Sequence, residues 1–148
     1  MISLSNPTAY ISGRKITMKN NSRPSLAAFM NSDINKELNS KPEFMLLQSG
    51  YANGYVAIPP SHPDYNKNLM DDETIIVHGG VTFCEPFRIC KKKFKSIEFI
   101  EKPSEIASDW WVIGFDTCHC FDSLDSCPKQ YVIEQTLSLK SQLEARWK

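Results

Sequence analysis

The sequence carries no surplus of charge and no long apolar run. Its 148 residues include 17 Lys or Arg and 17 Asp or Glu, so the formal net charge is zero. Proteins that bind nucleic acids generally need excess cations to displace the counterions around phosphates, and this balance argues against that class. The longest apolar stretch, residues 110–115, is far shorter than the about 20 residues that span a bilayer. We therefore expect neither general nucleic-acid binding nor a membrane span.

Two further features are missing, and both bear on location. The first residues lack the basic segment and apolar core of a secretory signal. The five cysteines are an odd number, and their spacings do not repeat the Cys-x₂₋₄-Cys pattern of zinc sites. We expect reduced thiols in a cytoplasmic protein without a cofactor or metal. The alternative is a metal site built from Cys118, Cys120, His119 and His78.

The common catalytic signatures are absent as well. The sequence has no P-loop, no dinucleotide-binding fingerprint, no nucleophile elbow and no HExxH motif. A Cys–His nucleophile pair of Cys84 and His119 would require the two to meet in space, and nothing in the sequence selects it. Function must therefore be argued from individual residues and their surroundings.

Short apolar or β-branched runs bounded by Gly, Pro or polar residues predict several strands. They lie at residues 10–18, 44–47, 55–58, 74–77, 81–83, 96–100 and 110–115. The last run is the most apolar window and predicts a central strand, in which Gly114 indicates either a close approach of another group to the backbone or a bulge.

Apolar spacing also predicts two helices. One runs from Ser25 to Leu38 with Ser25 as its N-cap, and Asn31–Asp33 is a place where it could restart. The other begins at Pro128, and its apolar face comprises Val132, Ile133, Leu137, Lys140, Leu143 and Trp147. Together the elements predict an α+β fold: a single domain over residues 1–148, with a mostly antiparallel sheet and helices packed on one face.

Residues 77–80 combine a histidine with two glycines at the end of a predicted buried strand. His78 would place its imidazole at the sheet edge, and Gly79 and Gly80 would let a ligand approach main-chain N–H groups, as anion sites require. The alternative is a hairpin turn with an incidentally placed histidine.

Residues 115–122 follow the most apolar strand, where functional groups are often mounted on a rigid support. Asp116 and His119 form a candidate carboxylate–imidazole pair, and Asp122 supplies a second carboxylate. The alternative is a polar loop in which an aspartate caps a helix.

Two other segments are candidates for ligand binding. In the proline-rich loop 59–65 the backbone is fixed around His62, and Tyr55 and Tyr65 could stack on a base; the alternative is that His62 and Tyr65 only pin the loop to the domain. A run of five cations could attract a phosphorylated ligand, or could be a solvated charged loop. These cations are Arg88, Lys91, Lys92, Lys93 and Lys95.

Three motifs together resemble a family of small proteins common in bacteriophage genomes and prophages. The family pattern reads G-Y-V-x-[VI]-P-x-x-H-P-x-Y, then H-G-G-[LV]-T-[FY], then W-W-F-G-F-D-C-A-H-x-G-D, and the match covers about residues 50–140. Residues 1–49 are a less familiar N-terminal extension. The third motif departs from the pattern at Thr117, Cys118 and Phe121, where Phe121 replaces the glycine before Asp122.

The resemblance implies a counter-defence role in the host cytoplasm, in which a small protein binds or degrades a nucleotide immune signal. We predict that the protein sequesters a small anionic, nucleotide-like ligand, as a homo-oligomer if the pocket is completed between subunits. One alternative is a phosphodiester hydrolase with His78, His119 and Asp116 as catalytic residues. Another is an inhibitor that binds a host protein. The predicted ligand-binding residues are His62, Tyr65, His78, Gly79, Gly80, Trp111, Asp116 and His119.

Overall fold

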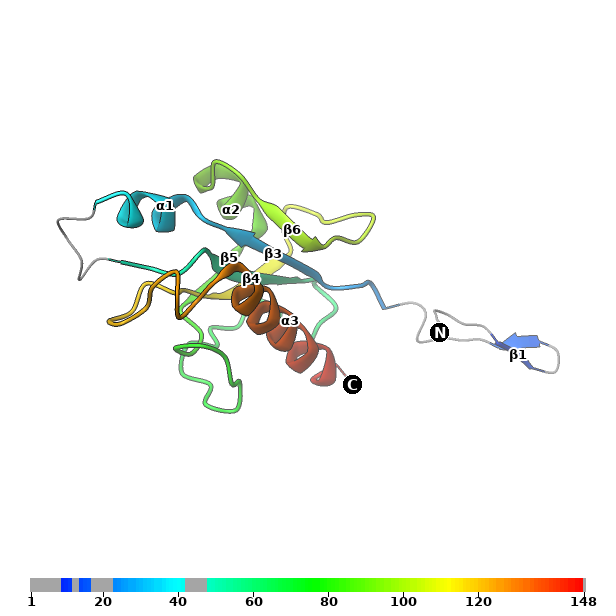
Figure 1. Ribbon diagram of the computed structural model, residues 1–148. Helices are drawn as coiled ribbons and strands as arrows, with labels where there is room; N and C mark the ends of the chain where they lie inside the picture. The colour runs from blue at the N-terminus through cyan, green and yellow to red at the C-terminus, as the bar shows by residue number, and fades with distance from the viewer. Residues whose placement is uncertain (1–8, 12–13, 17–22, 42–47, 148) are drawn as a thin grey trace.

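A five-stranded antiparallel sheet forms the centre of the computed structural model, which describes residues 9–11, 14–16, 23–41 and 48–147 (Figure 1). The strand order is β5-β7-β4-β3-β6. Two further strands, β1 and β2, pair antiparallel with each other in a separate ladder. The strands are β1 (Ala9–Ile11), β2 (Arg14–Ile16), β3 (Ala27–Asn31), β4 (Asn53–Ile58), β5 (Phe83–Pro86), β6 (Glu98–Glu101) and β7 (Trp111–Phe115).

Strand β4 is central and is buried on both faces. Tyr55 and Ala57 point into one apolar cluster, while Val56 and Ile58 point into another on the opposite face. Gly114 of β7 pairs with Tyr55, whose ring lies where a side chain at position 114 would be. The close approach that the sequence predicts at Gly114 is therefore confirmed, and an aromatic ring is its cause.

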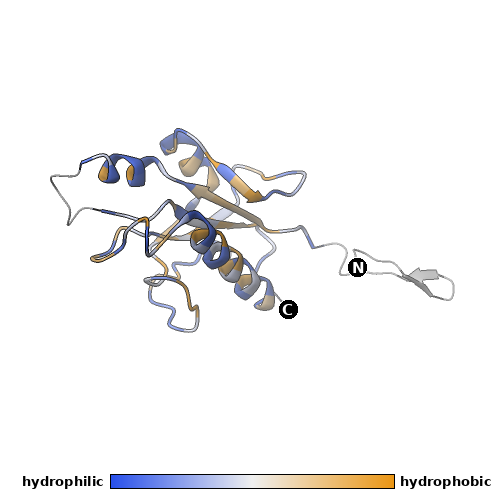
Figure 2. Cartoon of the chain, viewed as in Figure 1, coloured by the Kyte–Doolittle hydropathy of each residue, from blue (hydrophilic) through white to orange (hydrophobic). Residues whose placement is uncertain are grey.

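Each face of the sheet carries a helix. Helix α3 (Lys129–Ala145) places Val132, Leu139 and Leu143 in the cluster with Val56, whereas α2 (Phe87–Lys93) places Phe87 in the cluster with Tyr55. Figure 1 shows α2 and α3 on opposite sides of the sheet, and Figure 2 shows strands with hydrophobic colour between them. The predicted α+β fold is confirmed. Helix α3 packs on one face of the sheet as predicted, whereas α2 packs on the other face.

The predicted helix from Ser25 to Leu38 is wrong in its first half. Residues 27–31 form β3, and helix α1 begins only at Asp33 and ends at Asn39. The apolar residues from Leu26 to Met30 are consecutive and all buried, because β3 is an interior strand with both faces covered. A run of consecutive apolar residues is compatible with a buried helix or a buried strand. Here its pairing with β4 and β6 makes it a strand.

The predicted strand at 74–77 is also wrong, although Ile75 and Val77 are buried. The backbone of Ile76 bonds to the side chain of Gln142 in α3 instead of to a neighbouring strand. The Ile76 N–H donates to Gln142 Oε1 at 2.8 Å, and Gln142 Nε2 donates to the Ile76 carbonyl at 2.7 Å. The sequence shows the apolar pattern of a strand, but the hydrogen-bond partner is a helix surface.

Most of the remaining predicted strands are present but begin or end at different residues. The strands predicted at 55–58, 96–100 and 110–115 are confirmed as β4, β6 and β7, and the one at 81–83 becomes β5 two residues later. The run 10–18 holds two short strands, β1 and β2, while 44–47 lies outside the described residues. The buried stripe of α3 keeps Val132 and Leu143 from the prediction but otherwise runs through Thr136 and Leu139. Within the described residues, no helix is long and apolar enough to cross a membrane.

Candidate functional site

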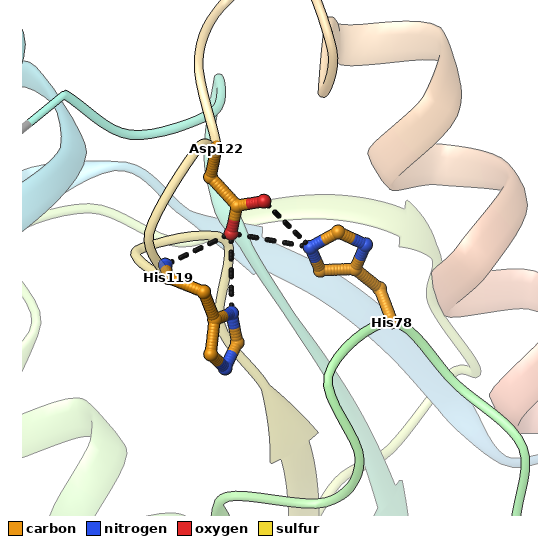
Figure 3. A group of neighbouring side chains, drawn as sticks. All are labelled: His78, His119 and Asp122. Carbon is orange, nitrogen blue, oxygen red and sulfur yellow. Dashed lines mark hydrogen bonds and ion pairs between the residues drawn. The ribbon is translucent and has the colours of Figure 1, made fainter.

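Two histidines from distant loops converge on one carboxylate (Figure 3). His78 Nε2 lies 3.0 Å from Asp122 Oδ1 and 3.1 Å from Oδ2, and His119 Nδ1 lies 3.1 Å from Asp122 Oδ2. The centroids of the two imidazoles are 5.7 Å apart. A carboxylate only accepts hydrogen bonds, so Nε2 of His78 and Nδ1 of His119 carry the protons in these contacts.

The loop after β7 builds its half of the site from local hydrogen bonds. The Asp122 N–H donates to the carbonyl of His119 at 2.9 Å, and the His119 N–H donates back to Asp122 Oδ2 at 2.9 Å. Phe121 has φ 73°, in the left-handed region, and its side chain is 92% exposed. The residue that replaces the glycine of the resembling pattern thus adopts a conformation that glycine favours. Asp122 accordingly sits at the centre of the site.

A buried polar cluster supports this loop from below. The amide of Asn35 in α1 donates to Thr117 Oγ1 and to Asn53 Oδ1, each at 3.2 Å. The Thr117 N–H donates to Asn53 Oδ1 at 3.0 Å, and the Thr117 hydroxyl donates to the carbonyl of Ala52 at 2.8 Å. The start of the loop is therefore fixed to β4 and α1 by hydrogen bonds that water does not reach.

Helix α3 holds the other half. The His78 N–H donates to Gln135 Oε1 at 2.8 Å, and the Tyr131 hydroxyl lies 2.8 Å from His78 Nδ1. Because Nε2 of His78 donates to Asp122, Nδ1 is the acceptor and the tyrosine O–H is the donor. Both ring nitrogens of His78 are engaged, so this imidazole is fixed in orientation and tautomer.

Gly79 brings the His78 loop against the His119 ring. It has φ 68°, and a Cβ at this position would lie 2.7 Å from His119 Nε2. Gly80 has φ 80°, but a Cβ there would meet nothing within 4 Å. Gly79 is thus required by contact with the imidazole as well as by its backbone conformation.

The hydrogen bonds keep Asp122 ionised. Partial burial raises its pKa, but the His119 N–H and the imidazoles of His78 and His119 lower it more, so the pKa lies below its ordinary value. The resulting carboxylate orients His119 with Nδ1 as donor. Among the described residues, Nε2 of His119 has no hydrogen-bond partner, and the side chain is 38% exposed. This arrangement leaves a basic nitrogen open to a substrate.

The predicted pairing of Asp116 with His119 is present but secondary. Asp116 Oδ1 lies 3.4 Å from His119 Nδ1, beyond the 3.1 Å of Asp122, and it accepts the N–H of Cys118 at 3.0 Å. Asp116 therefore adds negative charge beside the imidazole and shapes the loop, while Asp122 is the residue that orients the ring.

The same atoms are arranged as metal ligands could be. One donor atom from each of His78, His119 and Asp122 lies within 4.8 Å of the others, and two imidazoles with one carboxylate are a donor set of catalytic zinc sites. Cys127 lies beside them, with Sγ 3.8 Å from His78 Nε2, and burial raises the pKa of its thiol. The alternative set with Cys118 and Cys120 is not assembled in the described part of the chain. Cys118 Sγ contacts Asn35 and Asn53, and Cys120 is exposed.

Three predicted ligand-binding residues lie outside this cluster, which corrects the expected single pocket. His62 is buried, its Nε2 donates to the Leu143 carbonyl at 2.7 Å, and its Nδ1 accepts the Asp64 N–H at 3.0 Å. The Tyr65 hydroxyl donates to the carbonyl of Asp109 at 2.6 Å, and Trp111 Nε1 donates to that of Lys67 at 2.7 Å. The bonds of His62 and Tyr65 are those of the alternative, in which these two rings pin loop 59–65 to the domain, while Trp111 bonds Lys67 just beyond that loop.

The basic run is likewise separated from the histidines. Arg88 and Lys91–Lys93 belong to α2, on the face of the sheet opposite α3, which holds His78. Tyr55, a candidate for stacking on a base, is buried on the face of the sheet that α2 covers. The cations of α2 and the histidine cluster therefore lie on opposite faces of the sheet.

Sequence reasoning missed the residues of α3 that hold His78. Tyr131 and Gln135 are four positions apart, so they share one helix face beside the buried stripe. The sequence signal that could have indicated a polar contact is a tyrosine and a glutamine at this spacing, beside the apolar face of the helix. Nothing in the sequence indicates that their shared partner, His78, lies 53 residues before Tyr131 and 57 before Gln135.

Comparisons of the chain with protein-family models, curated proteins and solved structures find no match. The resemblance to phage proteins therefore stays a prediction. The functional argument rests on the geometry of His78, His119 and Asp122.

Proposed function

We propose that the protein is a hydrolase that cleaves a phosphodiester in a small nucleotide-like molecule by general acid–base catalysis. One observation carries the proposal: Asp122 binds His78 and His119 together and leaves Nε2 of His119 open. An imidazole oriented by a carboxylate through Nδ1 is suited to take a proton at Nε2.

In this mechanism His119 Nε2 removes a proton from a water molecule. The water oxygen forms a bond to phosphorus, the P–O bond to the leaving group breaks, and the leaving oxygen receives the proton back from His119. Asp122 stabilises the imidazolium that exists between the two transfers. His78 fixes Asp122 and is a positioning residue, because both of its ring nitrogens are already engaged.

The test is to incubate the protein with cyclic dinucleotides, cyclic ADP-ribose isomers and linear dinucleotides, denature it, and separate the products by chromatography. The proposal expects cleavage that is lost in His119→Ala and falls by about 10²–10⁴-fold in Asp122→Asn. Asp125→Asn, an exposed position in the same loop, is the matched control and should retain activity. Ligand that is bound but returned intact would overturn hydrolysis and support sequestration instead.

Metal-assisted hydrolysis by the same residues is a second candidate, which the 4.8 Å grouping of donor atoms favours. His78 also has its other ring nitrogen bonded to Tyr131, as metal-binding histidines usually have a partner there. The measurement is hydrolysis after dialysis against EDTA and after addition of Zn²⁺ or Mn²⁺. Activity that survives EDTA supports acid–base catalysis alone, whereas activity restored only by a metal supports this candidate.

A further inference from the structure

A groove on the face of the sheet opposite α3 is separate from the histidine site. Its volume is about 620 Å³, and it lies between α2 and the segment that follows it. The lining is apolar at the floor and charged at the rim. It includes Phe87, Lys91, Ile97, Phe99, Lys102 and Ile106. A volume of this size falls within the roughly 300–1,000 Å³ of small-molecule sites.

The charges around the groove are mostly of one sign, although the whole protein is neutral. Of the glutamates in this segment, Glu98 pairs with Lys129 at 2.8 Å and Glu101 pairs with Lys140 at 2.9 Å, so both are engaged by α3. Only Glu105 lines the groove as an acid. Two cations line the groove, Lys91 and Lys102, and neither forms an ion pair within the described residues. The remaining cations of the run lie on α2 or shortly after it and do not line the groove: Arg88, Lys92, Lys93 and Lys95.

Two of these cations are held over the aromatic floor. Lys91 Nζ lies 5.7 Å from the centroid of the Phe87 ring, and Lys102 Nζ lies 5.0 Å from that of Phe99. Contact with the ring faces keeps the ammonium groups at the groove and partly shields them from water. A positive rim above an apolar floor is complementary to a molecule with an anionic group and an apolar body.

We propose that this groove binds a small amphipathic organic anion, with its apolar body against Phe99, Ile97 and Ile106 and its anionic group between Lys91 and Lys102. A mononucleotide and an aliphatic carboxylate share this chemistry. The site is independent of the proposed hydrolysis, because none of its residues contacts His78, His119 or Asp122 among the described contacts. It gives Lys91 of the basic run a role that the histidine site does not.

The experiment is a fluorescence titration of the full chain with the aromatic sulfonate 1-anilinonaphthalene-8-sulfonate. AMP and decanoate are then tested as competitors that represent the two sources of such an anion. Adenosine and inorganic phosphate, the two halves of AMP, are tested separately. The proposal expects one saturable site, competition by AMP or decanoate, and at least about tenfold weaker competition by either half alone. Affinity should also fall as salt is raised, because exposed charges are screened. Competition by only one of the two anions identifies the source.

Charge-reversal variants locate the site. Lys102→Glu and Lys91→Glu should each weaken binding by about tenfold or more, and Ile106→Asp should abolish it. Lys41→Glu makes the same change of charge on an exposed lysine near the end of α1 and is the matched control. Near-ultraviolet circular dichroism of each variant verifies native packing. Unchanged binding in Lys91→Glu and Lys102→Glu, competition by adenosine or inorganic phosphate as strong as that of the competing anion, or no saturable binding at all would each overturn the proposal.

Discussion

The backbone of Gly79 lies against the imidazole of His119, and a Cβ at position 79 would come 2.7 Å from Nε2. The contact joins two loops that are 40 residues apart and keeps the open nitrogen beside bare main chain. It makes Gly79 a residue of the site, although its side chain is only a hydrogen atom.

Gly79→Ala should disturb the site, and Gly80→Ala should not. Both positions have positive φ, so each substitution is expected to cost about 1–2 kcal/mol of stability from the backbone alone. Only Gly79→Ala also forces the His119 ring to move. We expect hydrolysis by folded Gly79→Ala to be lost while Gly80→Ala keeps it, measured by chromatography beside urea unfolding. Equal activity in the two variants would contradict the role assigned to this contact.

Phe121→Gly should stabilise the protein. Phe121 has φ 73° and an exposed side chain, so glycine relieves the left-handed backbone without loss of packing. The expected gain is about 1 kcal/mol in the free energy of unfolding. Phe121→Ala keeps the Cβ and should give no gain. Urea denaturation distinguishes the two, and a destabilised Phe121→Gly would show that the exposed ring makes a contact that matters.

His62→Leu should reduce stability and leave the chemistry intact. The substitution removes the imidazole bonds to the buried Leu143 carbonyl and to the Asp64 N–H. The Leu143 carbonyl keeps the Arg146 N–H as a donor, but the Asp64 N–H is left unpaired, and the loss of both bonds is expected to cost about 2–4 kcal/mol. Tyr65→Phe, which loses one partly exposed hydrogen bond to Asp109, should cost about 1 kcal/mol or less. If the activity of His62→Leu fell even after correction for its unfolded fraction, His62 would belong to the site after all.

Stability should fall in acid as Asp72 and Asp122 are protonated. Hydrogen bonds from Thr74 and Arg146 lower the pKa of Asp72 from 3.8 to about 2, and the pKa of Asp122 is also lowered. A pKa that is lower in the folded state gives stability above the ordinary pKa and loses it as the pH falls toward the folded value. Urea midpoints of the wild type should therefore drop between pH 4 and pH 2. Asp72→Asn should show a shallower drop, and an unchanged slope would count against this assignment.

Much of the sheet could be predicted from the sequence because β4 and β7 are short apolar runs bounded by turn residues. The boundary between β3 and α1 could not, because burial on both faces gives Leu26–Met30 a pattern that a helix could also produce. The segment 74–77 failed for a different reason. Ile75 and Val77 are buried as residues of a strand would be, but Gln142 of α3 replaces the neighbouring strand.

The site was predictable in its residue types and only partly in its geometry. His78, Gly79 and His119 stood out because histidine and glycine follow apolar runs, and they do meet. His62 and Trp111 stood out for similar reasons, yet each bonds a nearby carbonyl. Whether a polar ring meets a ligand or its own main chain depends on the arrangement of distant segments, and local sequence does not encode that arrangement.

The segment that carries His78 takes its main-chain partners from Gln135 and Gln142 of the 17-residue helix α3. Detachment of that helix from the sheet would remove Gln135 Oε1 from the His78 N–H and the Tyr131 hydroxyl from the His78 imidazole in a single step. Hydrogen exchange at His78 should therefore track exchange in α3. Heat or proteolysis that releases the carboxyl-terminal helix is expected to abolish the proposed hydrolysis.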